Sequence, residues 1–254
     1  MPGPRLFFID SKNIIDNQIS ISNTALRHIT KVLRIGVGDK IWIADERKKR
    51  YLIELTDANH KKAQGKILET KEAAEPPAIE IILLQSILKG EKMDMLIQKA
   101  TELGVSKILP LISERTIIKV KSPGKEKRWQ SIAKEASQQS GRWEVPEFAP
   151  VTCFEDVFEK IGVIDFGLIL WEKESENKLK DVFKRYAACL FGRQGSIKKI
   201  CVFIGPEGGF TEKEIGLAKE KGFISVSMGD LILRAETATI TIIGILQYEF
   251  GNIG

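Results

Sequence analysis

The sequence predicts an α/β fold whose larger part is a mostly parallel sheet, preceded by a smaller β-rich domain. Beyond about residue 75, apolar segments of strand length alternate with segments of helix length, which is typical of a parallel sheet covered on both faces. Before that point, short strand-like segments dominate. The stretch Glu72–Pro77 separates the two, because two adjacent prolines favour extended backbone and the composition changes there. We therefore predict domains at residues 1–74 and 75–254.

Short strands and one helix account for the first domain. The expected strands are residues 5–9, 40–44, 51–56 and 66–70, with a hairpin tip near 48–50. The helix is expected at residues 26–34, because Leu26, Ile29, Val32 and Leu33 share one face and leave Arg27, Lys31 and Arg34 toward solvent. Small β-barrels commonly bind oligonucleotides through one face. We interpret this domain as an RNA-docking barrel, and a purely structural barrel is the alternative.

The second domain is predicted to alternate strands and helices along its whole length. The expected strands are residues 79–84, 105–111, 166–171, 200–204 and 224–228. The expected helices are residues 91–103, 127–139, 178–188, 212–221 and 235–250. Ligands of such doubly wound sheets bind at the carboxyl ends of the strands.

Composition limits the class of protein. With 254 residues and 43% hydrophobic content, the chain can bury one sizeable core together with a small second domain. Neither a long apolar run nor a signal peptide is visible, so we expect a soluble, cytoplasmic protein with no membrane association. Cys153, Cys189 and Cys201 are far apart and only two histidines could join them, so we expect no disulfide framework and no bound metal.

The positive charge is concentrated in two regions. The formal net charge is +5, with +4 in residues 1–75 and a local +5 between residues 112 and 142. Two basic regions separated by near-neutral sequence fit a polyanion held at two places, although lysine-rich surfaces are also common for solubility alone. Charge therefore permits a nucleic-acid partner without requiring one.

Two unusual loops carry the strongest functional signal. Each follows an expected strand and opens a helix: Ile204–Phe210 is Ile-Gly-Pro-Glu-Gly-Gly-Phe, and Met228–Ala238 is Met-Gly-Asp-Leu-Ile-Leu-Arg-Ala-Glu-Thr-Ala. Thr211 with Glu214 forms a capping-box pattern after the first loop. The glycines permit close backbone approach, but neither the P-loop nor the dinucleotide pattern is present, and Glu207 would repel phosphate. These features favour a nucleoside ligand without phosphates.

The pair Gly-Pro-Glu-Gly-Gly and Leu-Arg-x-Glu-Thr-Ala resembles the RsmE family of SPOUT methyltransferases, which methylate N3 of uridine in small-subunit (16S) ribosomal RNA. Further blocks resemble that family in the same order along nearly the whole chain: residues 28–34, 89–93, 98–105, 113–116 and 139–142. The resemblance implies a parallel sheet with a deep trefoil knot near the C-terminus, preceded by a small PUA-like or OB-like barrel. It also implies S-adenosylmethionine as cofactor and a homodimer that packs through the final helix.

In the family, three loops of the knot hold the cofactor, and the resemblance assigns this role to matching residues here. The expected cofactor-binding residues are Leu170, Trp171, Glu172, Ile204, Gly205, Pro206, Glu207, Gly208, Gly209, Met228, Gly229, Leu231, Ile232, Leu233, Arg234, Thr237 and Ala238.

Methylation of an imide nitrogen needs orientation of the reactants and removal of the nitrogen-bound proton. A carboxylate and a guanidinium suit the proton transfer and the developing charge, so Glu236, Arg234 and Arg115 are the catalytic candidates. Without the motif, each would be an ordinary helix-end or surface ion-pair residue. The expected RNA-binding residues are Arg27, Lys31, Arg34, Lys89, Lys92, Arg115 and Arg142.

The leading hypothesis is thus an S-adenosylmethionine-dependent methyltransferase acting on small-subunit ribosomal RNA, which we expect it to encounter in an assembled particle. One alternative is an RNA-binding ribosome-assembly factor of the same fold without this base specificity. Another is a dinucleotide-dependent oxidoreductase, which is disfavoured because its fingerprint normally follows the first strand of the domain.

Overall fold

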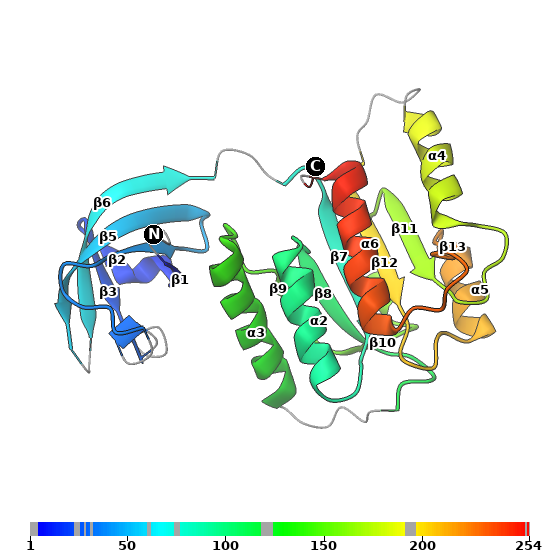
Figure 1. Ribbon diagram of the computed structural model, residues 1–254, viewed down its shortest axis with the longest axis horizontal. Helices are drawn as coiled ribbons and strands as arrows, with labels where there is room; N and C mark the ends of the chain where they lie inside the picture. The colour runs from blue at the N-terminus through cyan, green and yellow to red at the C-terminus, as the bar shows by residue number, and fades with distance from the viewer. Residues whose placement is uncertain are drawn as a thin grey trace. The chain divides into compact units, whose positions relative to one another are not determined.

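The computed structural model describes residues 5–22, 26–27, 29–30, 33–59, 62–73, 77–117, 124–190, 197–251 and 253, with the side chains of 187–190 excepted. The chain forms two units (Figure 1). The first comprises Met1–Pro76 together with Lys134–Val145, and the second comprises Pro77–Ala133 and Pro146–Gly254. The N-terminal unit therefore includes a segment that lies well beyond the Pro76–Pro77 linker.

The first unit is built on one mostly antiparallel sheet. Its strands are β1 (Leu6–Phe8), β2 (Ile14–Ile15), β3 (Gln18–Ile21), β4 (Lys40–Ala44), β5 (Lys49–Ala58) and β6 (Ala63–Glu72), and a short 3-10 helix, η1 (Ser11–Asn13), precedes β2. They lie in the order β1-β4-β5-β6-β3-β2, and only β1 pairs with its neighbour in parallel. Alternate side chains of β3 and β5 point into the core, which holds Ile19, Ile21, Ile53 and Leu55.

The hairpin of β2 and β3 was not expected from the sequence, because its strands are only two and four residues long. Its turn residues Asp16 and Asn17 have φ values of 44° and 65°. Asp and Asn tolerate this left-handed conformation and favour the tight turns that join hairpin strands. The Asp-Asn pair was therefore an available signal for the missed strands.

The segment 134–145 contacts the first unit through charged and aromatic side chains. The Arg50 guanidinium lies over the Trp143 ring, 3.9 Å from its centroid, and Lys48 pairs with Glu144 at 2.9 Å. The apolar cluster around Leu6 also includes Val145. These contacts explain why a segment so distant in the sequence belongs to this unit.

The second unit is a sheet in which all strand pairs are parallel, as the alternating pattern predicted. Its strands are β7 (Glu80–Ser86), β8 (Lys107–Ile112), β9 (Glu147–Phe148), β10 (Thr152–Cys153), β11 (Phe166–Leu170), β12 (Lys199–Ile204) and β13 (Ile224–Val226). The order is β10-β8-β7-β12-β11-β13, with β9 also paired to β8. The central strands β7 and β12 are buried almost throughout, as strands covered on both faces must be.

Helices connect these strands and cover the sheet (Figure 1). They are α2 (Glu91–Glu102), α3 (Gly124–Ser140), η3 (Val157–Glu159), α4 (Leu179–Leu190), α5 (Glu212–Glu220) and α6 (Ala235–Phe250). The predicted helix at residues 235–250 has the same bounds in the structure. In the part of the chain described here, no helix combines the length and the apolar character needed to span a bilayer.

An aromatic cluster fixes the end of the first glycine-rich loop in the core. Phe210 is the last residue of that loop and is 1% exposed. Its ring centroid lies 5.4 Å from that of Phe154 and 6.2 Å from that of Phe203. Burial of one such ring stabilises a fold by about 2–3 kcal/mol, so the loop ends on a firmly held residue.

Candidate active site

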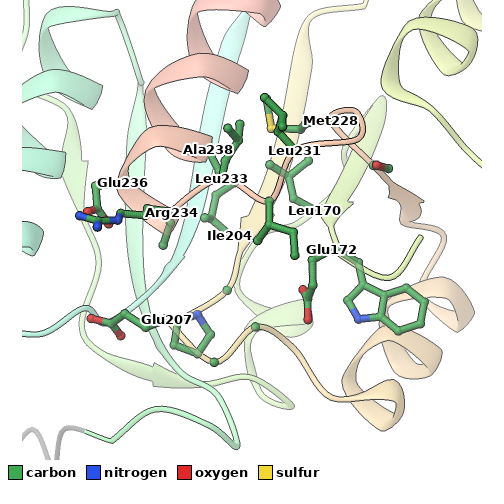
Figure 2. Close-up of a pocket in the computed structure, with 18 of the residues that line it drawn as sticks. Leu170, Glu172, Ile204, Glu207, Met228, Leu231, Leu233, Arg234, Glu236 and Ala238 are labelled. Carbon is green, nitrogen blue, oxygen red and sulfur yellow. The ribbon is translucent and has the colours of Figure 1, made fainter. Parts of the chain in front are cut away.

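A cavity of about 600 Å³ opens where β11, β12 and β13 end, at the carboxyl edge of the parallel sheet. Figure 2 shows Leu170, Glu172, Ile204, Met228 and Leu233 among the side chains around it. The residues that line it are Lys92, Leu170–Glu172, Ile204–Gly209, Val226–Glu236 and Ala238. Three neighbouring strands thus deliver three loops to one cavity, the position where ligands of such sheets bind.

The structure brings together every residue expected to bind the cofactor except one. Thr237 is exposed and does not line the cavity. The cavity is also lined by residues that were not expected to bind the cofactor: Lys92, Val226, Ser227, Asp230, Ala235 and Glu236. Of these, Glu236 was expected to act in catalysis and Lys92 was expected to bind RNA.

The glycines of the first loop are required by close packing. Gly209 has a φ of +68°, and a Cβ atom there would lie 2.6 Å from Glu172 Oε1. Its N–H donates to the Pro206 carbonyl at 2.9 Å, which closes the turn. A Cβ on Gly205 would lie 3.3 Å from the Gly209 backbone. Side chains in these places would displace either the turn or the Glu172 carboxylate, so this sequence is needed for this shape.

Helix α5 begins directly after this loop with the capping box that the sequence predicted. Thr211 Oγ1 accepts the Glu214 N–H at 3.3 Å, and Glu214 Oε2 accepts the Thr211 N–H at 2.8 Å. Glu214 is only 3% exposed. Its other oxygen, Oε1, accepts the Glu114 N–H at 2.9 Å. One buried carboxylate therefore holds the start of α5 and the loop after β8 together.

The loop after β8 supports the glycine-rich loop from the other side. Arg115 Nη1 donates to the Gly208 carbonyl at 2.7 Å, and a Cβ on Gly208 would lie 3.4 Å from the Arg115 side chain. Thr211 Oγ1 also donates to Glu114 Oε2 at 3.0 Å. Arg115 is exposed and does not line the cavity. The structure thus gives Arg115 a contact that positions the glycine-rich loop.

The loop between β7 and α2 is tied to the same structure. The Lys89 N–H donates to Glu207 Oε1 at 3.1 Å, while the Lys89 residue itself is exposed. Glu207 is an exposed residue at the rim of the cavity. Its carboxylate consequently links two loops that are far apart in the sequence.

The third segment that lines the cavity runs from Val226 to the start of α6. Ser227 Oγ accepts the Gly229 N–H at 3.3 Å, and Gly229 has a φ of +132°. Beyond this turn, Leu231 and Ile232 are 80% and 83% exposed. Two adjacent apolar side chains are thus available at the edge of the cavity to contact a ligand or partner.

The loop after β11 is anchored by its backbone and by one buried carboxylate. The Trp171 N–H donates to the Val226 carbonyl at 3.1 Å, and its ring packs against the aromatic cluster. Glu174 accepts the N–H groups of Glu176 and Asn177 at 3.0 and 3.3 Å. Burial of Glu174 raises its pKa, but hydrogen bonds from Ser225, Glu176 and Asn177, together with the nearby Lys219 ammonium, outweigh that effect, and the pKa lies below its ordinary value. The charged form is thus part of the loop structure.

Helix α6 begins at the cavity with Arg234 and Glu236 (Figure 2). Arg234 is the N-cap, with φ −64° and ψ 150°, and its carbonyl accepts the Ala238 N–H at 2.8 Å. Glu236 is 9% exposed, and its Oε1 lies 3.5 Å from Lys92 Nζ. A carboxylate in the first turn is favoured by the helix dipole. The helix is fixed to β7 by Thr239, whose hydroxyl donates to Gln85 Oε1 at 2.8 Å.

The residues expected to bind RNA fall in different environments. Arg27 and Arg34 are exposed in the first unit, and Lys31 lies outside the described residues. Arg142, also in the first unit, is half-buried, and burial lowers its pKa below the ordinary arginine value. Lys92 lines the cavity of the second unit, and its side chain there is 40% exposed.

The cavity suits a nucleoside that carries hydroxyl and ammonium groups. Leu170, Ile204 and Leu233 supply apolar surface, and the carboxylates of Glu172, Glu207 and Glu236 accept hydrogen bonds. Its volume of about 600 Å³ falls in the range of cofactor sites. Within the described ranges, no group of His, Cys, Asp and Glu side chains is arranged to hold a metal ion.

Comparison with known families agrees with this class of site. The RNA methyltransferase domain family matches residues 74–247, and the RNA methyltransferase PUA domain family matches residues 21–68. The fold and the cavity are therefore those of an RNA methyltransferase with a PUA domain. More particularly, the chain belongs to the ribosomal RNA small subunit methyltransferase E family, as the two loop motifs predicted.

Relatives of this family and solved methyltransferase structures resemble the chain over nearly its full length. The Bacillus subtilis ribosomal RNA small subunit methyltransferase E is 31% identical over 234 residues, covering 91% of this chain and 90% of the relative. The crystal structure of such an enzyme from Neisseria gonorrhoeae, bound to S-adenosyl methionine, is 30% identical with a TM-score of 0.85, covering 99% and 100% of the two chains. A Legionella pneumophila methyltransferase in complex with the same cofactor is 28% identical with a TM-score of 0.87 and the same coverage.

Proposed function

We propose that this protein transfers a methyl group from S-adenosylmethionine to N3 of a uridine in small-subunit (16S) ribosomal RNA. The observation that carries the proposal is the single cavity made by the loops after β11, β12 and β13 in a chain of this family. Relatives named for small-subunit ribosomal RNA methylation and a structure with the bound cofactor support both substrate and donor. When bound, the cofactor supplies an electrophilic methyl group on a sulfonium.

The cavity residues divide between holding the cofactor and handling the substrate. Leu170, Ile204 and Leu233 supply apolar contacts for the flat adenine, and Glu172 accepts hydrogen bonds from ribose hydroxyls. Glu236 takes the proton that leaves uracil N3, since it is the carboxylate at the start of α6 in this cavity. Arg234 contacts the substrate from the same helix end, and Arg115 acts by holding Gly208.

The first unit docks the ribosomal RNA. Exposed Arg27 and Arg34 provide cations that contact phosphates without reading sequence, and Arg142 and Lys31 complete the basic group expected from the sequence. The assembled small subunit is the substrate, which places the protein in the cytoplasm. If these arginines contact phosphates, replacing Arg27 or Arg34 by Gln lowers RNA affinity uniformly and reduces its salt slope by about 1 each, as filter binding would measure.

The catalytic domain carries the deep trefoil knot of its superfamily and forms a homodimer through α6. Ile240 and Ile245 on that helix are only half-buried in the single chain, and Tyr248 is 68% exposed. Apolar side chains left uncovered by their own fold are what an interface between two copies needs. Size-exclusion chromatography with light scattering should give twice the chain mass. A species of 28.5 kDa would contradict the dimer.

The activity is tested by incubating the protein with labelled S-adenosylmethionine and small subunits that lack the modification. Mass spectrometry of nucleosides from the recovered RNA should then show N3-methyluridine. A different methylated nucleoside would refute the base assignment. Cofactor binding without any methylation would favour another RNA substrate, and absence of both would favour the RNA-binding assembly factor.

A further inference from the structure

Lys92 lies in an unusual position for a basic residue. It is in the first turn of α2, lines the cavity, and places its Nζ 3.5 Å from Glu236 Oε1 on α6. The Lys92 side chain is 40% exposed and that of Glu236 is 11% exposed. The positive end of a helix dipole disfavours a cation in the first turn, so the helix itself does not explain the choice of lysine. The pairing with Glu236 inside the cavity does.

Glu236 is left incompletely satisfied by this pairing. Its Oε2 is buried and has no hydrogen-bond donor among the residues that the structure describes. Buried carboxylate oxygens in proteins nearly always have a donor. Rotation about the last side-chain bond exchanges the two oxygens cheaply, because this torsion is broad and two-fold. The carboxylate can therefore present an acceptor to a ligand donor while the ammonium remains beside it.

A ligand that satisfies both groups has an N–H next to an oxygen, which is the pattern of an imide. Uracil presents this pattern at N3–H and its neighbouring carbonyl oxygens. Cytosine presents an acceptor at N3 and a donor amino group beside it. In the same position its N3 acceptor would face the carboxylate, which is also an acceptor, and its amino donor would face the ammonium, which is also a donor. The pair consequently has the chemistry to accept uracil and to reject cytosine.

We propose that Lys92 and Glu236 together read the imide edge of the substrate uracil and activate it, an inference that rests on the proposed function. The N3–H bond breaks and its proton passes to the Glu236 carboxylate. The electron pair left on N3 forms the new bond to the methyl carbon as the carbon–sulfur bond breaks toward sulfur. The Lys92 ammonium contacts the adjacent carbonyl oxygen, where negative charge develops. Lys92 is thus a catalytic and specificity-determining residue.

The competing role for Lys92 is a phosphate contact, as the sequence alone indicated. A phosphate contact would lower RNA affinity for every sequence and reduce the salt slope of binding by about 1 when the lysine is removed. An imide contact would leave that slope unchanged and act on the chemical step and on base choice. The two roles therefore have separate signatures.

The test compares Lys92→Gln, Lys92→Arg and Glu236→Gln with a matched control, Lys99→Gln. Lys99 also lies on α2, is 41% exposed, and pairs with Glu102 at 2.8 Å, but it does not line the cavity. Calorimetry with S-adenosylhomocysteine should give affinities within about twofold of wild type for all four variants. Single-turnover methylation should fall about 10²–10³-fold in Lys92→Gln and about 10²–10⁴-fold in Glu236→Gln, with Lys92→Arg closer to wild type.

A binding measurement isolates base choice from turnover. With S-adenosylhomocysteine bound, the wild-type protein should prefer RNA with uridine at the target position over RNA with cytidine, and Lys92→Gln and Glu236→Gln should lose that preference. Small subunits containing 5-fluorouridine, whose N3 is more acidic, should restore part of the Lys92→Gln rate.

Three results would overturn the inference. These are a Lys92→Gln rate within threefold of Lys99→Gln, a reduced salt slope with an unchanged rate, or a Glu236→Gln protein that loses cofactor affinity. Failure of the wild type to form N3-methyluridine would instead refute the proposed function, so the two failures are distinguishable.

Discussion

Replacing Gly209 by alanine tests whether the shape of the glycine-rich loop positions the site. Gly209 has a φ of +68°, and a Cβ there would lie 2.6 and 2.7 Å from the two Glu172 oxygens. The left-handed conformation costs a residue with a Cβ about 1–2 kcal/mol. The Glu172 carboxylate can move away at smaller cost, because it is the end of a flexible side chain. The backbone strain in the loop therefore sets the size of the change in cofactor affinity or in stability.

This strain appears either in cofactor affinity or in stability. If the loop relaxes in the unbound protein and must be restored on binding, about 1–2 kcal/mol weakens cofactor affinity by about 5–30-fold. If the folded protein retains the strain, the melting temperature falls by about 2–8 °C for a chain of this size. Calorimetric titration with S-adenosylhomocysteine and a thermal melt measure the two quantities on one sample.

Gly208→Ala is the matched control for this prediction. Gly208 is the preceding residue, its φ is not positive, and its Cβ would meet Arg115 at 3.4 Å, an ordinary contact distance. Its effect should stay within about 0.5 kcal/mol. If Gly209→Ala matched Gly208→Ala in both affinity and melting temperature, the argument that the loop geometry requires glycine would be refuted.

Three further predictions concern buried polar groups. Glu214→Ala removes the acceptor of several hydrogen bonds and should destabilise the protein by about 2–4 kcal/mol in chemical denaturation. Glu212→Ala, on the exposed side of the same helical turn, is the control and should change stability by less than about 0.5 kcal/mol. Burial, together with the neighbouring Asp45 carboxylate, raises the pKa of Tyr51 to about 12. The contribution of the neutral phenol to stability is therefore complete below about pH 10 and is lost as the pH rises toward 12. Spectrophotometric titration should show this late ionisation, and a Tyr51→Phe protein that kept the late step would contradict the assignment. A thiol reagent should label exposed Cys153 in the native protein and leave buried Cys201 unlabelled until denaturant is added, because burial raises the pKa of the Cys201 thiol; equal labelling in peptide mass spectra would disprove the packing.

Hydrophobic periodicity was sufficient to predict the long helices and strands, because side chains within a few residues of one another determine which face of each element is buried. Helix α6 and the capping box of α5 follow from side chains within a few residues of one another, and both occur where the sequence placed them. The strands β2, β9 and β10 have two residues each, which is too short for any periodicity. Their pairing depends on neighbours from other parts of the chain.

The sequence predicted which loops line the cavity, but it did not predict all of the residues that line it. The loop after β12 carries glycines that close packing requires, and Gly229 in the loop after β13 has a φ of +132°, so the residues of both loops were expected at a site. Lys92 belongs to a different motif and reaches the cavity only because α2 lies against α6. Residues 134–145 likewise belong to the first unit because of contacts between segments that are far apart in the sequence. Contacts between distant segments leave no periodic trace in the sequence.

The position of β12 in the sheet has a consequence for how the chain is made. β12 pairs with β7, and Lys199 lies opposite Glu80, 119 positions earlier in the chain. At about 5–20 residues per second, translation leaves roughly 6–24 s between the two strands. During this interval β8 can pair with one edge of β7, while the other edge of β7, whose centre is the apolar run Ile81–Leu84, has no partner strand. Apart from Lys92, the residues that line the cavity lie at Leu170 or later in the chain. The nascent chain therefore needs protection from aggregation for nearly half of its synthesis, and the cavity is completed only as the last quarter of the chain leaves the ribosome.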